Sequence, residues 1–246
     1  SRSRIIPVDS ELSAIFQCLQ GELSPVEKIY LTASGGPFLN HDKASLKNVN
    51  VEEALNHPVW QMGKKVSIDS ATLMNKGMEL ICASYLFELS PSQIEVVVHP
   101  QGFIHSMVEF IDGSIKSQMA FPDMQTPIKY ALNFPMRLDS KKNKKSPLEF
   151  PPLTFEAPDF EKFRNLALAY KALEKGGNSP CVLNASNEIA VFAFLNHQIS
   201  FLEIPDVVER CLEEIQWART PSLKEYYECD SQTRYLAEEI VLKLRS

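Results

Sequence analysis

The chain has 246 residues, 44% of them hydrophobic and 23% charged, with a formal net charge of −6. This composition is typical of a globular protein, and the length suffices for one large domain or two smaller ones. The acidic balance argues against a nucleic-acid partner, and the lack of any apolar run of ~20 residues argues against a membrane-spanning segment.

The cysteines have no spacing typical of a zinc or redox motif, so we expect reduced thiols in a reducing compartment. They are Cys18, Cys82, Cys181, Cys211 and Cys229. The chain starts with Ser1-Arg2-Ser3-Arg4 directly before an apolar segment. A native amino terminus rarely begins so close to a strand, and we therefore expect a truncated or cleaved chain.

Hydrophobic periodicity predicts alternating strands and helices in the first half of the chain. The expected elements are a strand over 5–8, a helix over 10–19, a strand over 28–33, a long helix over 69–87 and a strand over 94–98. Asp112-Gly113 predicts a hairpin between strands over 107–111 and 114–120. Because this pattern combines crossover helices with a hairpin, we expect an α/β domain built on a mixed sheet.

Prolines and a lysine run predict an extended connector over residues 134–159. The run extends from Lys141 to Lys145 and fits a solvated linker better than a nucleic-acid patch, because no aromatic residues are interleaved with it. Helical spacing follows over 160–173, 182–195, 205–216 and 230–244. We therefore expect a mixed-sheet domain over 1–133, a proline-rich connector over 134–159 and an α-helical bundle over 160–246.

Two carboxylates, Asp9 and Glu11, lie where the first predicted strand becomes a helix. One interpretation is a helix N-cap followed by an acidic first turn. The other is a functional site, because α/β folds place such sites at the carboxyl ends of strands. The residues by themselves leave both interpretations open.

The predicted helix over 69–87 carries a narrow polar stripe between apolar neighbours. At helical spacing the stripe comprises Thr72, Asn75, Lys76 and Glu79. Gly77 lies in the middle of the helix, where glycine costs about 1 kcal/mol relative to alanine. A solvent-facing ion pair would explain the stripe, but a close approach of a ligand or another backbone would explain the glycine as well.

Asp9, Glu11 and Glu79 together would form an all-oxygen site of the kind that suits Mg²⁺ or Mn²⁺. The Ser34-Gly35-Gly36 segment follows a predicted strand and is either a plain turn or an anion-binding turn. Combined with Ser70, Asn75 and Lys76, it could hold one phosphate group.

Residues 57–65 predict a loop that contains Trp60 and Met62. These two side chains either close over a ligand as a lid or dock on the core of the domain itself. His99 and His105 lie six residues apart and are either a metal pair or, as we favour, polar residues with hydrogen-bond partners at a strand end.

Several segments resemble signature segments of the 1-deoxy-D-xylulose 5-phosphate reductoisomerase family, in the same order and spacing from Ile6 to the carboxyl terminus. They are Val8-Asp9-Ser10-Glu11, residues 31–38, His57-Pro58-Val59-Trp60-Gln61-Met62-Gly63, residues 69–72, Asn75-Lys76-Gly77-Met78-Glu79, His99-Pro100-Gln101, Pro122-Asp123-Met124 and Leu183-Asn184-Ala185-Ser186-Asn187-Glu188.

The resemblance implies an oxidoreductase and isomerase that uses NADPH and Mn²⁺ or Mg²⁺, with residues 1–133 as its catalytic domain. It would convert 1-deoxy-D-xylulose 5-phosphate, a phosphorylated sugar, to 2-C-methyl-D-erythritol 4-phosphate by skeletal isomerisation and then reduction. This reaction belongs to the non-mevalonate route to isoprenoid precursors. The resemblance also implies a homodimer in the bacterial cytoplasm or the plastid stroma.

The resemblance assigns roles to individual side chains. The implied metal ligands are Asp9, Glu11 and Glu79, which are catalytic together with His57. The implied substrate contacts are Ser10, Ser34, His57, Trp60, Ser70, Asn75, Lys76 and Glu79. Trp60 and Met62 would form the lid, while Met62 and Met124 would lie near the cofactor.

The sequence departs from the family pattern in two places, and these limit the activity and the contacts that the resemblance implies. No G-x-G-x-x-G turn occurs in the 246 residues, so we expect the chain as it stands to lack the reduction step. Gly102 replaces the usual serine of its loop. The competing hypotheses are a metal and phospho-sugar binding module without redox chemistry, and a non-redox metal-dependent isomerase or aldolase.

Overall fold

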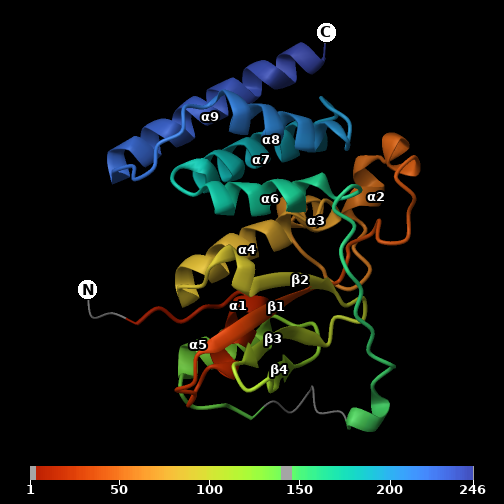
Figure 1. The fold of residues 1–246 in the computed structure, drawn as a ribbon. Helices are drawn as coiled ribbons and strands as arrows, with labels where there is room; N and C mark the ends of the chain where they lie inside the picture. Colours follow the sequence, from red (N-terminus) through yellow and green to blue (C-terminus); the bar gives the residue numbers. More distant parts are fainter. Residues whose placement is uncertain (1–3, 140–145, 246) are drawn as a thin grey trace. The chain divides into compact units, whose positions relative to one another are not determined.

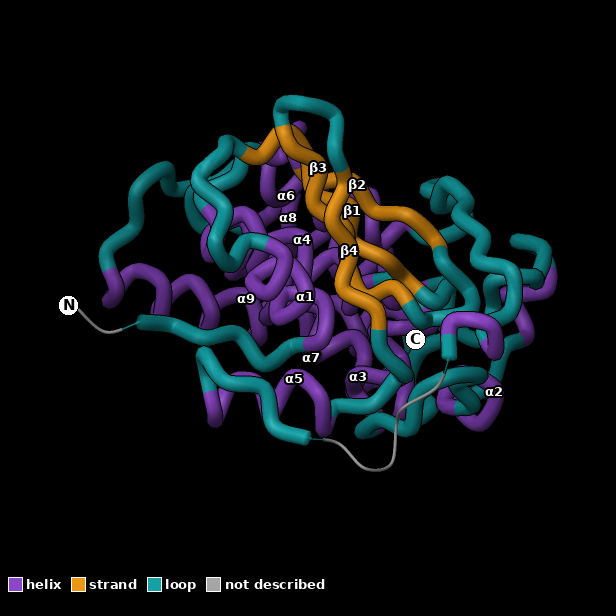
Figure 2. The backbone as a smooth tube through the Cα atoms, turned by 90° about the horizontal axis from the view of Figure 1, so that it is seen from below, coloured by secondary structure: helices purple, strands orange, loops and turns teal. Residues whose placement is uncertain are grey.

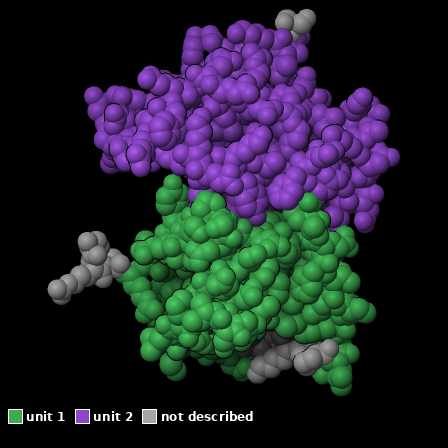
Figure 3. Space-filling model, in the orientation of Figure 1, with its two compact units in different colours: residues 1–34, 82–158 green, residues 35–81, 159–246 purple. Residues whose placement is uncertain are grey.

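The computed structural model describes residues 4–139 and 146–245. Backbone packing divides the chain into two compact units (Figure 3): unit 1 contains residues 1–34 and 82–158, and unit 2 contains residues 35–81 and 159–246. The division between residues 158 and 159 lies next to an expected boundary, but residues 35–81, which we expected in the sheet domain, pack with the C-terminal helices. The assignment of residues 1–133 as a catalytic domain stays a prediction.

Unit 1 is built on a four-stranded sheet in the order β2-β1-β3-β4. Its strands, which lie side by side in Figure 2, are β1 (Val26–Ala33), β2 (Ile94–Val98), β3 (Ile104–Phe110) and β4 (Ile115–Met119). Strand β1 runs parallel to β2 and antiparallel to β3, and β3 runs antiparallel to β4. The predicted mixed sheet is thus confirmed.

Helix α1 (Ser10–Cys18) packs on this sheet, mainly against β3 and β4. It buries Leu12, Ala14 and Ile15. A second helix of the unit, α5 (Gln125–Asn133), contacts α1 and has no counterpart among the expected elements.

The segment over 5–8 is not the predicted strand. It forms no pairing with any strand, and Ile5 is 71% exposed. The hairpin after β3 is confirmed in position: Gly113 adopts a φ of 80°, and the carboxylate of Asp112 accepts hydrogen bonds from the backbone and hydroxyl of Ser114.

Unit 2 consists of helices. They are η1 (Ser45–Asn48), α2 (Val51–Leu55), α3 (Lys64–Ala71), the start of α4 (Met74–Phe87), α6 (Arg164–Lys175), α7 (Ser179–Leu195), α8 (Glu203–Glu214) and α9 (Leu223–Leu244). Helix α7 packs against α6, α8 and α9 (Figure 1), so the four expected C-terminal helices are confirmed. Ile68 and Ala71 of α3 belong to the same apolar core as Val191 of α7.

The expected continuous helix over 69–87 is wrong, because the chain breaks at Thr72 and Leu73 to form α3 and α4. Leu73 is buried with a φ of 59°, outside the helical region, and the hydroxyl of Thr72 accepts a hydrogen bond from the backbone N–H of Met74. Thr72 therefore does not belong to the polar stripe of α4. The mid-helix glycine is explained by packing, since a Cβ at Gly77 would lie 2.5 Å from the Cβ of Ala169 on α6.

The connector carries one short 3-10 helix, η3 (Pro147–Glu149), and then pairs Glu156 with Val98 at the end of β2. The lysine run at 141–145 lies outside the described residues. Within the described ranges, the helices lack the combination of length and apolar character that crossing a membrane requires.

Candidate metal and phosphate residues

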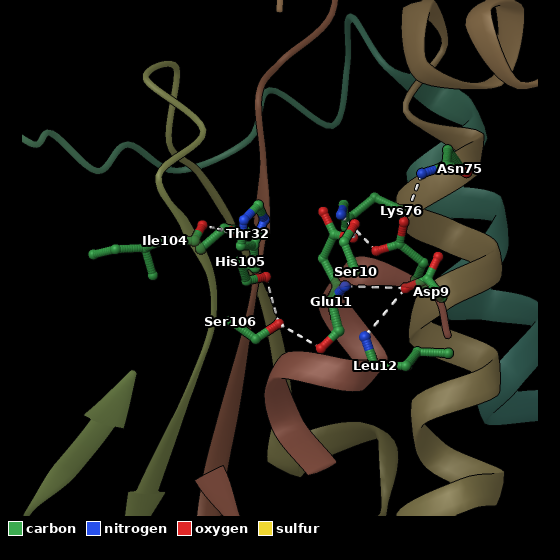
Figure 4. A network of polar contacts seen from close by, with 11 residues as sticks. Asp9, Ser10, Glu11, Leu12, Thr32, Asn75, Lys76, Ile104, His105 and Ser106 are labelled. Carbon is green, nitrogen blue, oxygen red and sulfur yellow. Dashed lines mark hydrogen bonds and ion pairs between the residues drawn. The ribbon is translucent and has the colours of Figure 1, made fainter. Parts of the chain in front are cut away.

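Asp9 is the N-cap of α1. Its Oδ1 accepts hydrogen bonds from the backbone N–H groups of Glu11 and Leu12, both at 3.1 Å (Figure 4). The capping interpretation of the sequence is therefore confirmed, and it leaves the second oxygen of the carboxylate outside the cap. Capping fixes the carboxylate at the start of the helix, where the positive end of the helix dipole favours negative charge.

Glu11 lies in the first turn of α1, and both its side-chain carboxylate and its backbone carbonyl accept hydrogen bonds. The hydroxyl of Ser10 donates to its carboxylate, and the hydroxyl of Ser106 on β3 lies 3.1 Å from its backbone carbonyl oxygen. Both Asp9 and Glu11 are half-buried. Unit 1 thus holds two partly shielded carboxylates at the start of α1, while the strand that the second interpretation of the sequence placed before them does not form.

In unit 2, Asn75, Lys76 and Glu79 form a compact polar group on α4. The amide nitrogen of Asn75 donates to Oε1 of Glu79 at 2.6 Å, and Nζ of Lys76 lies 2.5 Å from Oε2 (Figure 4). The side chains of Lys76 and Glu79 are each only 5% exposed. This burial contradicts a simple solvent-facing ion pair, because a surface pair would keep most of its area in water.

The glycine turn after β1 packs against the end of α3. Gly36 has a φ of 68°, and a Cβ there would lie 2.7 Å from the backbone oxygen of Ser70. Only glycine permits this approach, which brings the turn that follows Ser34 next to Ser70. The close approach connects two of the segments expected to bind phosphate.

Asp69, next to Ser70, belongs to a buried network that the sequence analysis missed. Its carboxylate accepts a hydrogen bond from Asn187 of α7 at 2.9 Å and pairs with Lys65 at 2.5 Å. Burial raises the pKa of Asp69, while Lys65 and Asn187 act in the opposite direction. The i, i+4 spacing of Lys65 and Asp69 is a signal from which an ion pair could have been predicted, whereas no local pattern points to Asn187.

His57 holds the beginning of the expected lid. Its Nδ1 accepts hydrogen bonds from the backbone N–H groups of Val59 at 3.1 Å and Trp60 at 2.8 Å. Burial lowers the pKa of His57, and this geometry requires an unprotonated Nδ1. Met62 is half-buried just before α3, so His57, Trp60 and Met62 lie in one segment of unit 2.

The histidines after β2 do not form the alternative metal pair. His99 is fully buried, and its Nδ1 lies 2.9 Å from the carbonyl oxygen of Thr154 while its Nε2 accepts from the N–H of Phe103 at 3.2 Å. Both ring nitrogens are engaged, so His99 is a structural residue, as favoured from the sequence.

Two further expected residues lie in unit 1. Gly102, in the loop after His99, has a φ of 66°, a conformation that glycine adopts without strain. Met124 directly precedes α5 and is 38% exposed.

Two family descriptions match the chain: residues 5–87 match the 1-deoxy-D-xylulose 5-phosphate reductoisomerase C-terminal domain, and residues 119–236 match the DXP reductoisomerase C-terminal domain. A reductoisomerase of this name from Bacteroides fragilis is 51% identical over 243 residues, which are 98% of this chain and 63% of the relative. The one from Porphyromonas gingivalis is 52% identical over 248 residues, covering 98% and 62%.

Solved structures agree with the sequence relatives. A DOX-P reductoisomerase in complex with NADPH, fosmidomycin and magnesium has a TM-score of 0.91 at 40% identity, covering 98% of this chain and 64% of that one. The enzyme from Zymomonas mobilis in complex with NADPH has a TM-score of 0.88 at 42% identity, covering 97% and 61%.

Fold and side chains thus define an α/β protein with a helical unit, equipped with partly shielded carboxylates and with hydroxyl and ammonium groups suited to an anion. The comparisons make the class specific: the chain belongs to the 1-deoxy-D-xylulose 5-phosphate reductoisomerase family. It spans about three fifths of the length of the curated relatives that it matches.

Proposed function

We propose that the chain provides the metal and substrate-binding part of an NADPH-dependent enzyme that converts 1-deoxy-D-xylulose 5-phosphate to 2-C-methyl-D-erythritol 4-phosphate. The observation that carries the proposal is the 51% identity to a reductoisomerase across 98% of the chain. The complexes of similar proteins with NADPH, fosmidomycin and magnesium support the same cofactors here.

The proposed metal ligands are Asp9, Glu11 and Glu79. Three carboxylates without sulfur or imidazole are a donor set that fits Mg²⁺ or Mn²⁺ and not zinc. Such an ion, when bound, polarises neighbouring substrate oxygens and stabilises negative charge. Ser10, whose hydroxyl donates to Glu11, is proposed to orient that ligand and to contact the substrate's hydroxyl groups.

The residues proposed to bind the substrate phosphate are Ser34, Ser70, Asn75 and Lys76. Lys76 supplies the only cation among them, and the other three supply neutral donors, a combination suited to one phosphate. The burial of Lys76 strengthens its field, because few waters screen it. Its ammonium group pairs with the carboxylate of Glu79 at 2.5 Å.

The loop from His57 to Met62 is proposed as a lid over the substrate. His57 is proposed as a catalytic and substrate contact, and Trp60 would exclude water from the substrate. Met62 and Met124 are proposed to lie near the nicotinamide. NADPH supplies a hydride when bound, and we propose that its main binding residues lie outside these 246 residues, because the relatives are longer and no G-x-G-x-x-G turn is present.

A homodimer and a bacterial cytoplasmic location complete the proposal. The relatives named above are bacterial proteins. The five cysteines are free thiols, which is consistent with a reducing compartment.

The proposed function is tested by comparing two ligands in calorimetric titrations with Mn²⁺ present: 1-deoxy-D-xylulose 5-phosphate and its unphosphorylated counterpart. We expect binding of the phosphorylated sugar only, and weaker binding by a Ser70→Ala variant. Equal affinity for the two sugars would contradict the proposed phosphate site. In the same samples, we expect NADPH absorbance to stay constant for this chain and to fall for a full-length relative.

A further inference from the structure

We infer that Asp69 and Asn187 are positioning residues that hold the phosphate-binding segments of unit 2 in place. The inference rests on the proposed function, because it takes Ser70 and Lys76 as phosphate donors. Neither Asp69 nor Asn187 is proposed to touch substrate. Their role is to fix the end of α3, from which Ser70 and the first residues of α4 project.

The contact between the two residues is short, buried and specific. Nδ2 of Asn187 donates to Oδ1 of Asp69 at 2.9 Å, and the residues are 0% and 2% exposed. The other carboxylate oxygen of Asp69 faces Nζ of Lys65, one turn earlier on α3. Asp69 therefore joins α3 to α7 through one oxygen and stabilises α3 itself through the other.

Helix α3 depends on tertiary contacts for its position because it is short. It has eight residues, and its N-cap, Gly63, provides no side-chain hydrogen bond. Isolated helices of this length are marginal in water, so tertiary contacts decide their geometry. Ile68 and Ala71 supply apolar contacts with the core, but apolar contacts are non-directional and do not fix the rotation of the helix as a hydrogen bond does.

The anchor is adjacent in the chain to Ser70, one of the proposed phosphate donors. Ser70 follows Asp69 in the chain, and its backbone oxygen is the surface against which Gly36 packs. After Ser70 the chain breaks at Thr72 and Leu73 and enters α4 at Met74, so a shift of α3 would move both the Gly36 turn and the start of α4. The position of Asp69 therefore affects three segments expected to surround the anion: the end of α3, the Gly36 turn and the start of α4.

The amide of Asn187 includes one atom whose burial destabilises the fold. Among the described residues its Oδ1 has no hydrogen-bond partner although it is buried, and a buried polar atom without a partner is unfavourable. An apolar residue of similar size would avoid this cost and fill the same space. The hydrogen bond to Asp69, and not packing, accounts for an amide at this position.

The test measures binding of inorganic phosphate to the 246-residue chain by following the backbone amide resonances of Ser70 and Gly36. Asn187→Leu removes the donor and keeps the side-chain volume. We expect the dissociation constant to rise by roughly tenfold, the lower end of the range for partners that orient a ligand residue. The matched control is Ser186→Ala on the same helix, whose hydroxyl donates to carbonyl oxygens of α7 itself, and it should leave phosphate affinity unchanged.

A swap tests the hydrogen bond itself. Asn187→Asp alone places two carboxylates in contact and should weaken binding. Adding Asp69→Asn restores one donor and one acceptor, with the amide oxygen of residue 69 still facing Lys65, and should recover part of the affinity. All comparisons are made at a temperature at which each variant is fully folded by circular dichroism, so that a loss of affinity reports position and not unfolding.

The outcomes separate this inference from the proposed function. If wild type binds no phosphate, or Ser70→Ala binds as wild type does, the phosphate site itself is wrong and the positioning role falls with it. If Ser70→Ala weakens binding but Asn187→Leu does not, the positioning role alone is wrong. Equal losses for Asn187→Leu and Ser186→Ala, or no recovery in the swap, would also overturn it.

Discussion

Lys76 and Glu79 form an ion pair one turn apart on α4, with their charged atoms 2.5 Å apart and each side chain only 5% exposed. Removing one partner of a buried pair leaves an uncompensated charge, which costs about 3–5 kcal/mol. We therefore expect Lys76→Met to lower the free energy of unfolding by about that amount in urea titrations with a metal chelator present.

The matched control is the surface pair of Lys224 and Glu228, in which the side chains are 86% and 53% exposed. Lys224→Met should change stability by less than about 0.5 kcal/mol. A Lys76→Met variant as stable as this control would show that the α4 pair is well hydrated in solution.

Gly77 is required by the packing of α4 against α6. A Cβ at Gly77 would lie 2.5 Å from the Cβ of Ala169, and overpacking of this kind costs about 1–3 kcal/mol. We expect Gly77→Ala to be destabilising in thermal unfolding despite the better helix propensity of alanine. Ala169→Gly should recover part of the loss, whereas Gly63→Ala, with no atom within 4 Å, should be near neutral. A stabilised Gly77→Ala variant would contradict this packing.

The turn at His57 should respond to pH. Protonation of Nδ1 would remove the acceptor for the N–H groups of Val59 and Trp60, and burial holds the folded-state pKa below its ordinary value of 6.5. Because the folded state binds the proton less readily than the unfolded state, the stabilisation from this turn is complete above 6.5. It is lost as pH falls from 6.5 through the lower folded-state pKa.

The fluorescence of Trp60 measures this transition in a Trp217→Phe background, since the chain has two tryptophans. We expect a spectral change on acidification that a His57→Gln variant does not show. The same titration in both variants would mean that another group controls the loop.

The thiols should differ widely in reactivity. Burial raises the pKa of Cys18 to about 11 and that of Cys211 to about 12, whereas Cys82 is exposed. Because the thiolate is the nucleophile, iodoacetamide at about pH 8 should modify Cys82 first, and Cys18 and Cys211 only after denaturation. Mass spectrometry of the labelled peptides identifies the sites, and early labelling of Cys211 would contradict its burial in the α8 core.

The sequence predicted the four strands of the sheet and the C-terminal helices because β-branched runs and helical periodicity reflect burial directly, but the apolar run over 5–8 wrongly predicted a fifth strand. It did not reveal the break between α3 and α4, which depends on the left-handed backbone of Leu73, a residue that reads as an ordinary helix former. It also missed α5, a short helix with Pro127 near its start.

The candidate residues also differ in whether a local sequence pattern indicates their contacts. The polar group on α4 follows from local spacing, since Asn75, Lys76 and Glu79 are within one turn of each other. The partner of Asp69 lies 118 positions away in the chain, and no local pattern can indicate such a contact. The burial of the Asp69 carboxylate depends on α7 in the same way, so the local sequence around Lys65 and Asp69 does not indicate it.

The central claim is that Asp9, Glu11 and Glu79 share one divalent ion, and Mn²⁺ binding measured by electron paramagnetic resonance tests it most directly. We expect one tight site in the wild-type chain, weakened by at least roughly tenfold in both Glu79→Gln and Asp9→Asn, and unchanged in the surface control Glu228→Gln. Equal Mn²⁺ affinity in wild type and Glu79→Gln would contradict the claim.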